Sequence, residues 1–144
     1  MSVPKYRRNE SPMQFLDTAR ELEIYTIQRC ANFPKRYMFL ITKELIDLSR
    51  SIYNNVKSAN SVYPTNKEES QIRVNFLIQA VCDLQCLASQ LDIAKGIVEH
   101  NDKDKAIKPT VWEQWARLIS TELKIVVALK KSLQGKYNLE PKPE

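Results

Sequence analysis

Apolar residues recur every three or four positions along most of this 144-residue chain. That spacing places them on one face of an α-helix. The pattern is interrupted by the stretches "NFPKRY", "SANSVYP" and "EHNDKDKAIKP", and Gly135 follows its last part. The pattern therefore predicts four helices, at roughly 12–32, 35–59, 66–100 and 110–134.

Capping motifs support three of the four predicted helix starts. In each motif a Ser or Thr stands three residues before a Glu or Gln, so that each side chain can bond the backbone N–H of the other residue. The pairs are Ser11 with Gln14, Thr65 with Glu68, and Thr110 with Glu113. Pro12 and Pro34 stand where proline suits the first turn of a helix.

One apolar row on each predicted helix is expected to face a common core. In chain order, the rows are Phe15, Leu22 and Phe33; Ile41, Leu45, Leu48, Ile52 and Val56; Ile72, Phe76, Ala80, Leu87, Leu91 and Ala94; and Trp115, Ile119, Val126, Leu129 and Leu133. The first connection is short, which favours packing between the helices that it joins. The chain is therefore predicted to be all-α, an antiparallel up-down four-helix bundle. Residues 1–136 make one domain with a basic arm at 1–10, and 137–144 form a flexible tail.

Three of the helices carry apolar residues outside the core row. They are Phe39, Ile46 and Tyr53; Val74, Ile78 and Val81; and the run "IVVAL" from Ile125 to Leu129. A monomeric bundle needs only one apolar row on each helix, so the extra rows predict self-association. The candidate residues for an oligomer or partner interface are Phe39, Ile46, Tyr53 and Val127. The alternative is that these side chains are exposed on a monomer, as some apolar residues always are.

Basic residues follow a seven-residue step on two of the predicted helices. One set is Arg36, Lys43, Arg50 and Lys57, and the other is Arg117, Lys124 and Lys131. A seven-residue step drifts only about 20° per heptad, so each set forms a nearly straight stripe. With Lys35 and Lys130, these are the candidate nucleic-acid-binding residues. The alternative is a solvated helix face, because Asp47 can pair with Lys43 and Arg50.

The distribution of charge adds to this picture. The net charge is +5, yet residues 66–104 hold four basic and seven acidic residues. Residues 105–136 hold seven basic and two acidic residues, and the arm adds Lys5, Arg7 and Arg8. Cations one heptad apart lie about 10 Å apart, whereas duplex DNA carries a charge every ~1.7 Å. One copy would therefore contact few phosphates, and an oligomer would bind through the sum of its contacts.

Catalytic motifs are absent from the sequence, so no enzyme and no cofactor are predicted. His100 stands at a helix end, and no Gly-rich phosphate loop is present. Asp83 and Glu122 interrupt core rows, and Arg29 falls on the core face of the first helix. Inward carboxylates of a bundle can hold two metal ions, but such sites use Glu-x-x-His pairs, which this chain lacks. A buried salt-bridge cluster that fixes helix register is the favoured interpretation. A metal-dependent bundle enzyme is the alternative.

Three cysteines, Cys30, Cys82 and Cys86, are an odd number without disulfide-framework spacing. They are expected to be free thiols in a reducing cytoplasm. Cys82 and Cys86, four residues apart, are expected to be buried thiols rather than half of a zinc site. The sequence begins without a secretory pattern and has no apolar run near the roughly 20 residues of a membrane span. A cytoplasmic protein without membrane contact is therefore expected.

The stretch "FPKRYMFLITKELIDLSRSIYNNVKSAN", Phe33 to Asn60, resembles the signature region of small four-helix-bundle proteins related to ribosomal-RNA intervening-sequence proteins. The opening "VPKYRRNESPMQFLDTA" and the break at Pro34 are similar to one branch of them. This branch is the accessory variability determinant (Avd) family of diversity-generating retroelements. The resemblance runs from about Val3 to Leu133 and consists of hydrophobic spacing and the "PKRY" helix start.

The resemblance implies a homopentameric ring with a basic surface that binds a dedicated reverse transcriptase and nucleic acid. Such proteins are non-catalytic and are required for error-prone cDNA synthesis from a template repeat RNA. The matched positions are Lys35, Arg36 and Tyr37. We therefore expect an accessory subunit that holds RNA or cDNA near the polymerase, largely without sequence specificity. The alternative is a helical protein–protein adaptor that does not bind nucleic acid.

Overall fold

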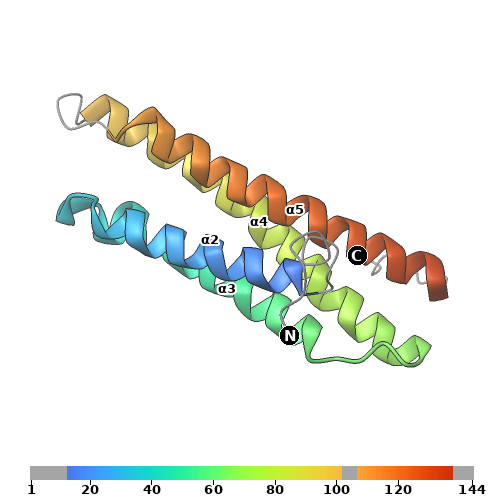
Figure 1. Cartoon of the computed structure of the whole chain (residues 1–144). Coiled ribbons are helices and arrows are strands. Elements are labelled where there is room, and N and C mark those ends of the chain that lie inside the picture. Colours follow the sequence, from blue (N-terminus) through green and yellow to red (C-terminus); the bar gives the residue numbers. More distant parts are fainter. Residues whose placement is uncertain (1–12, 102–106, 138–144) are drawn as a thin grey trace, which may run out of the picture.

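The computed structural model describes residues 13–101 and 107–137. These residues form helices and no strands, and four long helices account for most of them (Figure 1). The four are α2 (Gln14–Ala31), α3 (Lys43–Asn60), α4 (Lys67–Asn101) and α5 (Pro109–Tyr137). The four predicted helices are thus confirmed, with boundaries shifted by a few residues. None of the described helices combines the length and hydropathy that a membrane span requires.

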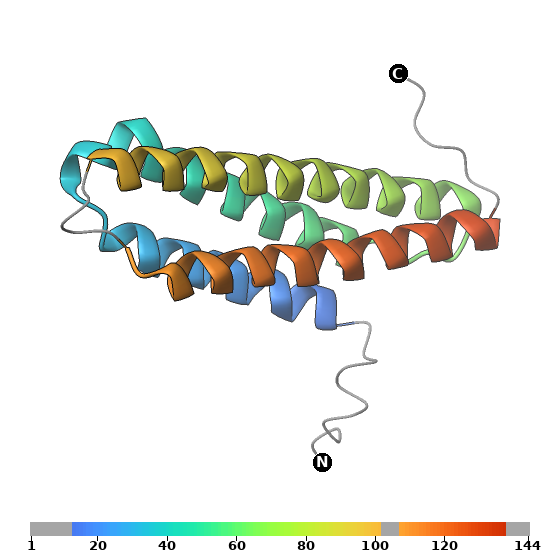
Figure 2. The same cartoon turned by 90° about the horizontal axis from the view of Figure 1, so that it is seen from above.

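The four helices pack side by side as a helical bundle (Figures 1 and 2). Helix α2 packs against α3 and α5, and α4 packs against the same two helices. Since α3 and α5 have no comparable contact with each other, they occupy opposite corners of the bundle. This arrangement matters for function, because the two predicted basic stripes belong to α3 and α5.

An aromatic cluster joins α2 to α5 at one end of the bundle. The rings of Trp112 and Trp115 stack with centroids 5.8 Å apart, and Phe33 meets both of them edge-on. The Trp115 indole N–H donates to the hydroxyl of Thr26 over 3.0 Å, and both residues are fully buried. Tyr25 adds a further edge-on contact to Trp115. The cluster therefore combines large apolar area with one satisfied polar contact.

At the other end of the bundle, α5 continues beyond its predicted stop. The helix passes through Gly135 and ends at Tyr137, whose hydroxyl donates to the Pro64 carbonyl oxygen over 2.9 Å. A glycine inside a helix costs only about 1 kcal/mol, which this anchor and the surrounding helix can offset. The prediction of a stop at Gly135 is therefore wrong, and Tyr137, the first residue of the predicted tail, belongs to α5. The rest of the predicted tail, 138–144, and the basic arm at 1–10 lie outside the described residues.

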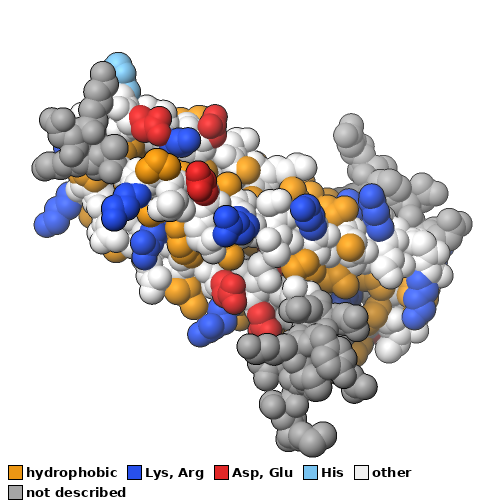
Figure 3. Space-filling model, turned by 45° about the horizontal axis from the view of Figure 1, so that its top comes forward, with side chains coloured by type: hydrophobic (Ala, Val, Ile, Leu, Met, Phe, Trp, Pro, Cys, Tyr) orange, Lys and Arg blue, Asp and Glu red, His pale blue; other side chains and the backbone are white. Residues whose placement is uncertain are grey.

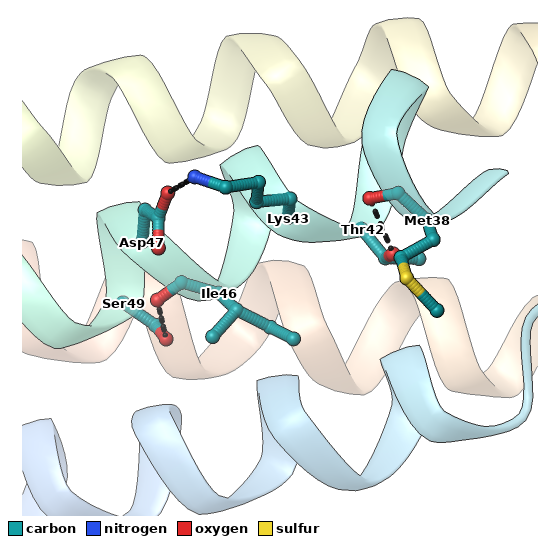
Figure 4. Close-up of polar contacts among 6 residues, drawn as sticks. All are labelled: Met38, Thr42, Lys43, Ile46, Asp47 and Ser49. Carbon is teal, nitrogen blue, oxygen red and sulfur yellow. Dashed lines mark hydrogen bonds and ion pairs between the residues drawn. The ribbon is translucent and has the colours of Figure 1, made fainter.

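The second predicted helix begins irregularly. A 3-10 turn, η1 (Lys35–Tyr37), and a π-helical turn, η2 (Met38–Thr42), precede α3. The Thr42 hydroxyl donates to the Met38 carbonyl oxygen over 3.1 Å (Figure 4). A side-chain bond of this kind competes with the regular backbone pattern. Helical-wheel positions counted back from α3 therefore do not apply to residues 35–42.

The core-facing row of α4 differs from the prediction at its N-terminal half. Ile72, expected in the core, is 48% exposed, and Phe76 is only half-buried. The buried apolar positions are Val74, Leu77, Ala80 and Leu84. Of these, Ala80 was predicted in the core row and Val74 in an extra row. Apolar residues occur on several sides of this helix, so periodicity alone does not select the buried side. From Leu87 onward the predicted and observed rows agree.

The helix caps also differ from the predicted motifs. At α4 the capping residue is Asn66 instead of the predicted Thr65. The side-chain oxygen of Asn66 accepts a hydrogen bond from the backbone N–H of Glu69 over 2.8 Å. Helix α5 begins at Pro109, so Thr110 is inside the helix and is not its cap. Helix α2 has Met13 at its N-cap position without a side-chain cap, and Ser11 and Pro12 lie outside the described residues. Each predicted helix still starts within three residues of its expected position. The second predicted helix is counted here from the first residue of η1.

Candidate nucleic-acid interface

The α3 stripe is defined here as Lys43, Arg50 and Lys57, which are all exposed on α3. Arg36 was predicted to continue this line, but it lies in η1, where the guanidinium covers the Tyr37 ring at 4.9 Å. Since η1 and η2 are not α-helical, the prediction of one straight line of four cations is wrong for Arg36. Lys35, in the same turn, is exposed.

Two cations of the α3 stripe have acidic neighbours. Lys43 donates to Asp47 over 2.8 Å (Figure 4), and this contact raises the pKa of the Lys43 amine. Arg50 lies 4.0 Å from Glu23 of α2 rather than beside Asp47. The predicted pairing of Asp47 is therefore confirmed for Lys43 only. Both pairs are largely exposed, so they are weak and can be displaced by a phosphate.

The α5 stripe is defined as Arg117, Lys124 and Lys131, which are exposed on one regular helix. Arg117 donates to the neutral Gln114 side chain over 3.0 Å. None of the three forms an ion pair within the described residues. Lys130, the remaining candidate on α5, is half-buried. The α5 stripe therefore presents its charge with less internal compensation than the α3 stripe.

The two stripes lie on helices at opposite corners of the bundle, and each points away from the core. One molecule therefore cannot present both stripes to the same short strand. Figure 3 shows basic side chains spaced along the length of one face, with apolar side chains and some acidic side chains exposed among them. A spacing of this kind suits repeated single phosphate contacts rather than a closed pocket.

The predicted interface residues differ in exposure. Phe39 is 82% exposed, whereas Ile46 and Tyr53 are half-buried and pack against the protein's own core. Val127 on α5 is also half-buried. Sequence reasoning missed Met38 and Leu40, which are 48% and 77% exposed beside Phe39. The consecutive apolar residues "YMFLI" were the available signal, because a helix cannot bury five residues in succession on one face.

The three candidate core charges do not form the expected salt-bridge cluster. Asp83 on α4 instead accepts hydrogen bonds from Ser51 and Asn55 of α3. The Arg29 guanidinium lies 5.2 Å from the centre of the Tyr25 ring, and its Nε has no hydrogen-bond partner among the described residues. The favoured interpretation of these residues is therefore wrong, because no ion pair links them in the described residues.

Glu122 is the most unusual polar residue of the core. Its side chain is fully buried, and neither carboxylate oxygen has a hydrogen-bond partner in the described part of the chain. Burial raises the pKa of Glu122 to about 9, because a charged carboxylate is poorly solvated in an apolar interior. The side chain is therefore protonated at neutral pH. In residues 13–101 and 107–137, no three His, Cys, Asp or Glu side chains cluster as a metal site.

The cysteines differ in accessibility. Cys30 is buried, whereas Cys82 and Cys86 are exposed on the outer side of α4. The expectation of buried thiols at positions 82 and 86 is therefore wrong. That expectation rested on the comparison with a zinc site, which would need two further ligands, and not on the position of the two residues relative to the core.

Cys82 and Cys86 are expected to react with an aromatic disulfide reagent in the native protein, and Cys30 only after unfolding. Burial raises the pKa of Cys30 to about 12, so its reactive thiolate is scarce at neutral pH. The measurement compares released chromophore before and after addition of guanidinium chloride. A variant with Cys82→Ser and Cys86→Ser should be unreactive until it unfolds. Rapid native reaction of that variant would contradict the burial of Cys30.

Comparison of this chain with models of known families, with curated proteins and with solved structures finds no match. The resemblance to the accessory variability determinant family therefore rests on the sequence motifs alone.

Proposed function

We propose that this protein is a non-catalytic accessory subunit of a retroelement reverse transcriptase. In this role it binds the polymerase together with RNA and cDNA and supports mutagenic reverse transcription in a diversity-generating retroelement. The observation that carries the proposal is the α5 stripe, whose three exposed cations have no acidic partner among the described residues. The sequence resemblance supplies the polymerase and the retroelement.

The α5 stripe is proposed as the primary phosphate-binding surface. Binding there does not require an existing ion pair to break, whereas Lys43 would have to leave Asp47. Lys57, at the far end of the α3 stripe, also has no ion pair in the described residues. The α3 stripe with Lys35 and Arg36 is therefore proposed as a second, weaker surface. Contacts of this kind are salt-sensitive and read little sequence.

The proposal includes an antiparallel up-down arrangement of the helices. Two contacts support it. Phe33, which follows α2, meets Trp112 near the start of α5, with ring centroids 6.0 Å apart. Tyr137, at the end of α5, bonds to Pro64 between α3 and α4. These contacts fit a chain whose successive helices run in opposite directions.

Self-association into a ring, a pentamer by the sequence resemblance, is also part of the proposal. Because α3 and α5 occupy opposite corners, one RNA strand cannot contact both stripes of the same copy. It can contact the same stripe on several neighbouring copies. A ring would repeat the α5 stripe and raise the effective concentration of phosphate contacts. The partly exposed apolar residues Phe39, Ile46, Tyr53 and Val127 provide contact surface for further copies or for the polymerase. A cytoplasmic location is proposed with this role.

Charge reversal on α5 tests the proposal. The variant with Lys124→Glu and Lys131→Glu is expected to lose RNA affinity by about tenfold or more at moderate salt, because two phosphate contacts become repulsive. The measurement is fluorescence anisotropy with a labelled single-stranded RNA. Sedimentation of this variant is measured in parallel, because Val127, a proposed interface residue, lies three or four positions from both lysines on α5. An unchanged sedimentation coefficient assigns the loss of affinity to the phosphate contacts.

A matched control separates a local surface from net charge. Lys67→Glu with Lys95→Glu changes the total charge equally but on the acidic helix α4. This control is expected to bind RNA nearly as well as the unaltered protein. Equal losses in both variants would refute a defined α5 surface. Absence of RNA binding by the unaltered protein would favour the adaptor function.

A further inference from the structure

Three consecutive large apolar side chains are exposed where the chain re-enters the bundle after α2. Met38, Phe39 and Leu40 have exposed fractions of 48%, 82% and 77%. No other three consecutive large hydrophobic residues of the described chain are exposed. Single exposed apolar residues are ordinary, but a contiguous group of this kind marks an interaction surface more often than chance.

The backbone explains why these residues face outward. The π-helical turn η2 contains all three, and it places the neighbouring Ile41 and Thr42 in the protein's interior. The Thr42 hydroxyl holds this turn through its bond to the Met38 carbonyl oxygen (Figure 4). Such turns are rare in helices and frequently occur at functional sites, because they redirect side chains at a cost in stability. The exposed group is therefore a product of the fold rather than of a frayed end.

Two adjoining depressions make this surface a groove at the start of α3. One of them lies between α2 and α3, and the other is lined by η2 and α3 alone. Both are lined by Met38, Thr42 and Ile46. In Figure 4 the side chains of Met38 and Ile46 lie on the side of α3 that faces α2. One depression adds apolar residues of α2 and its connection, including Ile27 and Phe33, and the other adds Phe39. The groove therefore has an apolar floor along more than one helical turn.

The charged rim of the groove is mostly basic. Lys35, Lys43 and Arg50 line the two depressions, and Asp47 is the one acidic residue among their lining side chains. Asp47 is paired with Lys43, and Glu23 lies 4.0 Å from Arg50. An apolar floor with a basic rim is complementary to an amphipathic segment whose flanks are acidic.

We propose that this groove binds an acidic amphipathic helix of a partner protein. The apolar residues of that helix, spaced by three and four, would lie on Met38 and Ile46, and its carboxylates would pair with Lys35 and Arg50. This is the helix-in-groove mode of recognition. The inference rests on the proposed function only in assuming a protein partner, and it assigns that partner to the α3 side. A partner helix in the groove would cover Lys35 and Arg50 of the weaker RNA surface, and the α5 stripe on the opposite corner would remain available for RNA.

The probe for the test is a labelled synthetic peptide of about 18 residues, or five helical turns. It carries leucines at spacings of three and four with glutamates at the flanking positions, and a second peptide has lysines in place of the glutamates. Fluorescence anisotropy measures the binding of each. The acidic peptide is expected to bind, with an affinity that falls as salt rises, and the basic peptide is expected to bind at least about tenfold more weakly.

Substitutions locate the binding site. Met38→Glu is expected to weaken binding of the acidic peptide by about tenfold or more, because it places a charge in the apolar floor. Met38 is half exposed, so this variant should fold. The matched control is Ile93→Glu on α4, whose side chain is 52% exposed and lies outside the groove. The control should bind the peptide like the unaltered protein.

Several results would overturn the inference. The acidic peptide could fail to bind, could bind Met38→Glu unchanged, or could bind no better than the basic peptide. A lower sedimentation coefficient for Met38→Glu, but not for Ile93→Glu, would assign the groove to a second copy of this chain instead. RNA binding by the same variants is measured separately. Its loss in Lys124→Glu with Lys131→Glu tests the proposed function, whatever the peptides do.

Discussion

Replacing Glu122 with leucine is expected to stabilise the protein by roughly 3 kcal/mol at pH 7. The carboxyl group is fully buried without a hydrogen-bond partner in the described residues, and its pKa is raised to about 9. In the unfolded chain the same group has a pKa near 4.5 and is ionised at pH 7. Folding must therefore bind a proton at this pH, which lowers the free energy of unfolding.

The pH dependence follows from the same difference in pKa. The pKa of this carboxyl group is raised by folding. Its full contribution to the free energy of unfolding is therefore present below the unfolded-state pKa of 4.5, where the folded and unfolded states are both protonated. That contribution is lost as pH rises toward about 9, because only the unfolded state gains by ionising. Between these two pKa values, ionisation of Glu122 in the unfolded state should lower the free energy of unfolding by up to about 1.4 kcal/mol per pH unit.

Urea unfolding at several values of pH between 5 and 9 measures this effect. Glu122→Gln is expected to remove most of the pH dependence, and Glu122→Leu should also raise the midpoint. The matched control is Glu113→Gln, an exposed position on the same helix, which should leave the profile unchanged. A Glu122→Gln profile parallel to that of the unaltered protein would contradict the account of Glu122.

Trp115→Ala is expected to reduce the free energy of unfolding by about 3–5 kcal/mol. Trp115 is fully buried, stacks on Trp112 and contacts Tyr25 and Phe33 edge-on. Its truncation leaves a cavity between α2 and α5 and removes the donor that satisfies Thr26. A loss of this size is comparable to the whole stability of many domains.

Trp115→Phe separates the loss of ring packing from the loss of the hydrogen bond to Thr26. It keeps most of the ring contacts but leaves the Thr26 hydroxyl without its partner, so a smaller loss of about 1–3 kcal/mol is expected. Urea unfolding followed by far-ultraviolet circular dichroism measures both variants. The control is Tyr63→Ala, which truncates an aromatic residue that is 78% exposed and should change stability little. Equal effects of Trp115→Ala and Tyr63→Ala would mean that the aromatic cluster does not join the helices.

The number and extent of the helices followed from the sequence because prolines and polar breaks separate long periodic runs. The buried faces of α2, α3 and α5 were predicted, because Leu22, Ile52 and Trp115 of the predicted core rows are fully buried. Helix α4 was not, because apolar residues lie on several sides of it and neighbouring helices select the buried one. This is why Ile72 was wrongly placed in the core.

The candidate site was predictable in part. Exposure of Lys124 and Lys131 follows from their position opposite the core row of α5. The partner of Arg50 did not follow, because Glu23 approaches from another helix and only tertiary packing brings it near. The groove at Met38 was also hidden, since a helical wheel assumes α-helical geometry and η2 departs from it. Sequence periodicity therefore fails on this chain at the irregular turn η2 and wherever neighbouring helices decide which side chains are buried or paired.

The most direct test of the proposed function is RNA affinity measured by fluorescence anisotropy across a salt series from about 50 to 200 mM. Three cations on one stripe account for a log–log slope of about 2 on single-stranded RNA, at ~0.7 per phosphate contact. Because the α3 and α5 stripes face apart, several copies that share one RNA should give a steeper slope. A slope of about 2 or less, or no binding at the lowest salt, would contradict a nucleic-acid-binding oligomer.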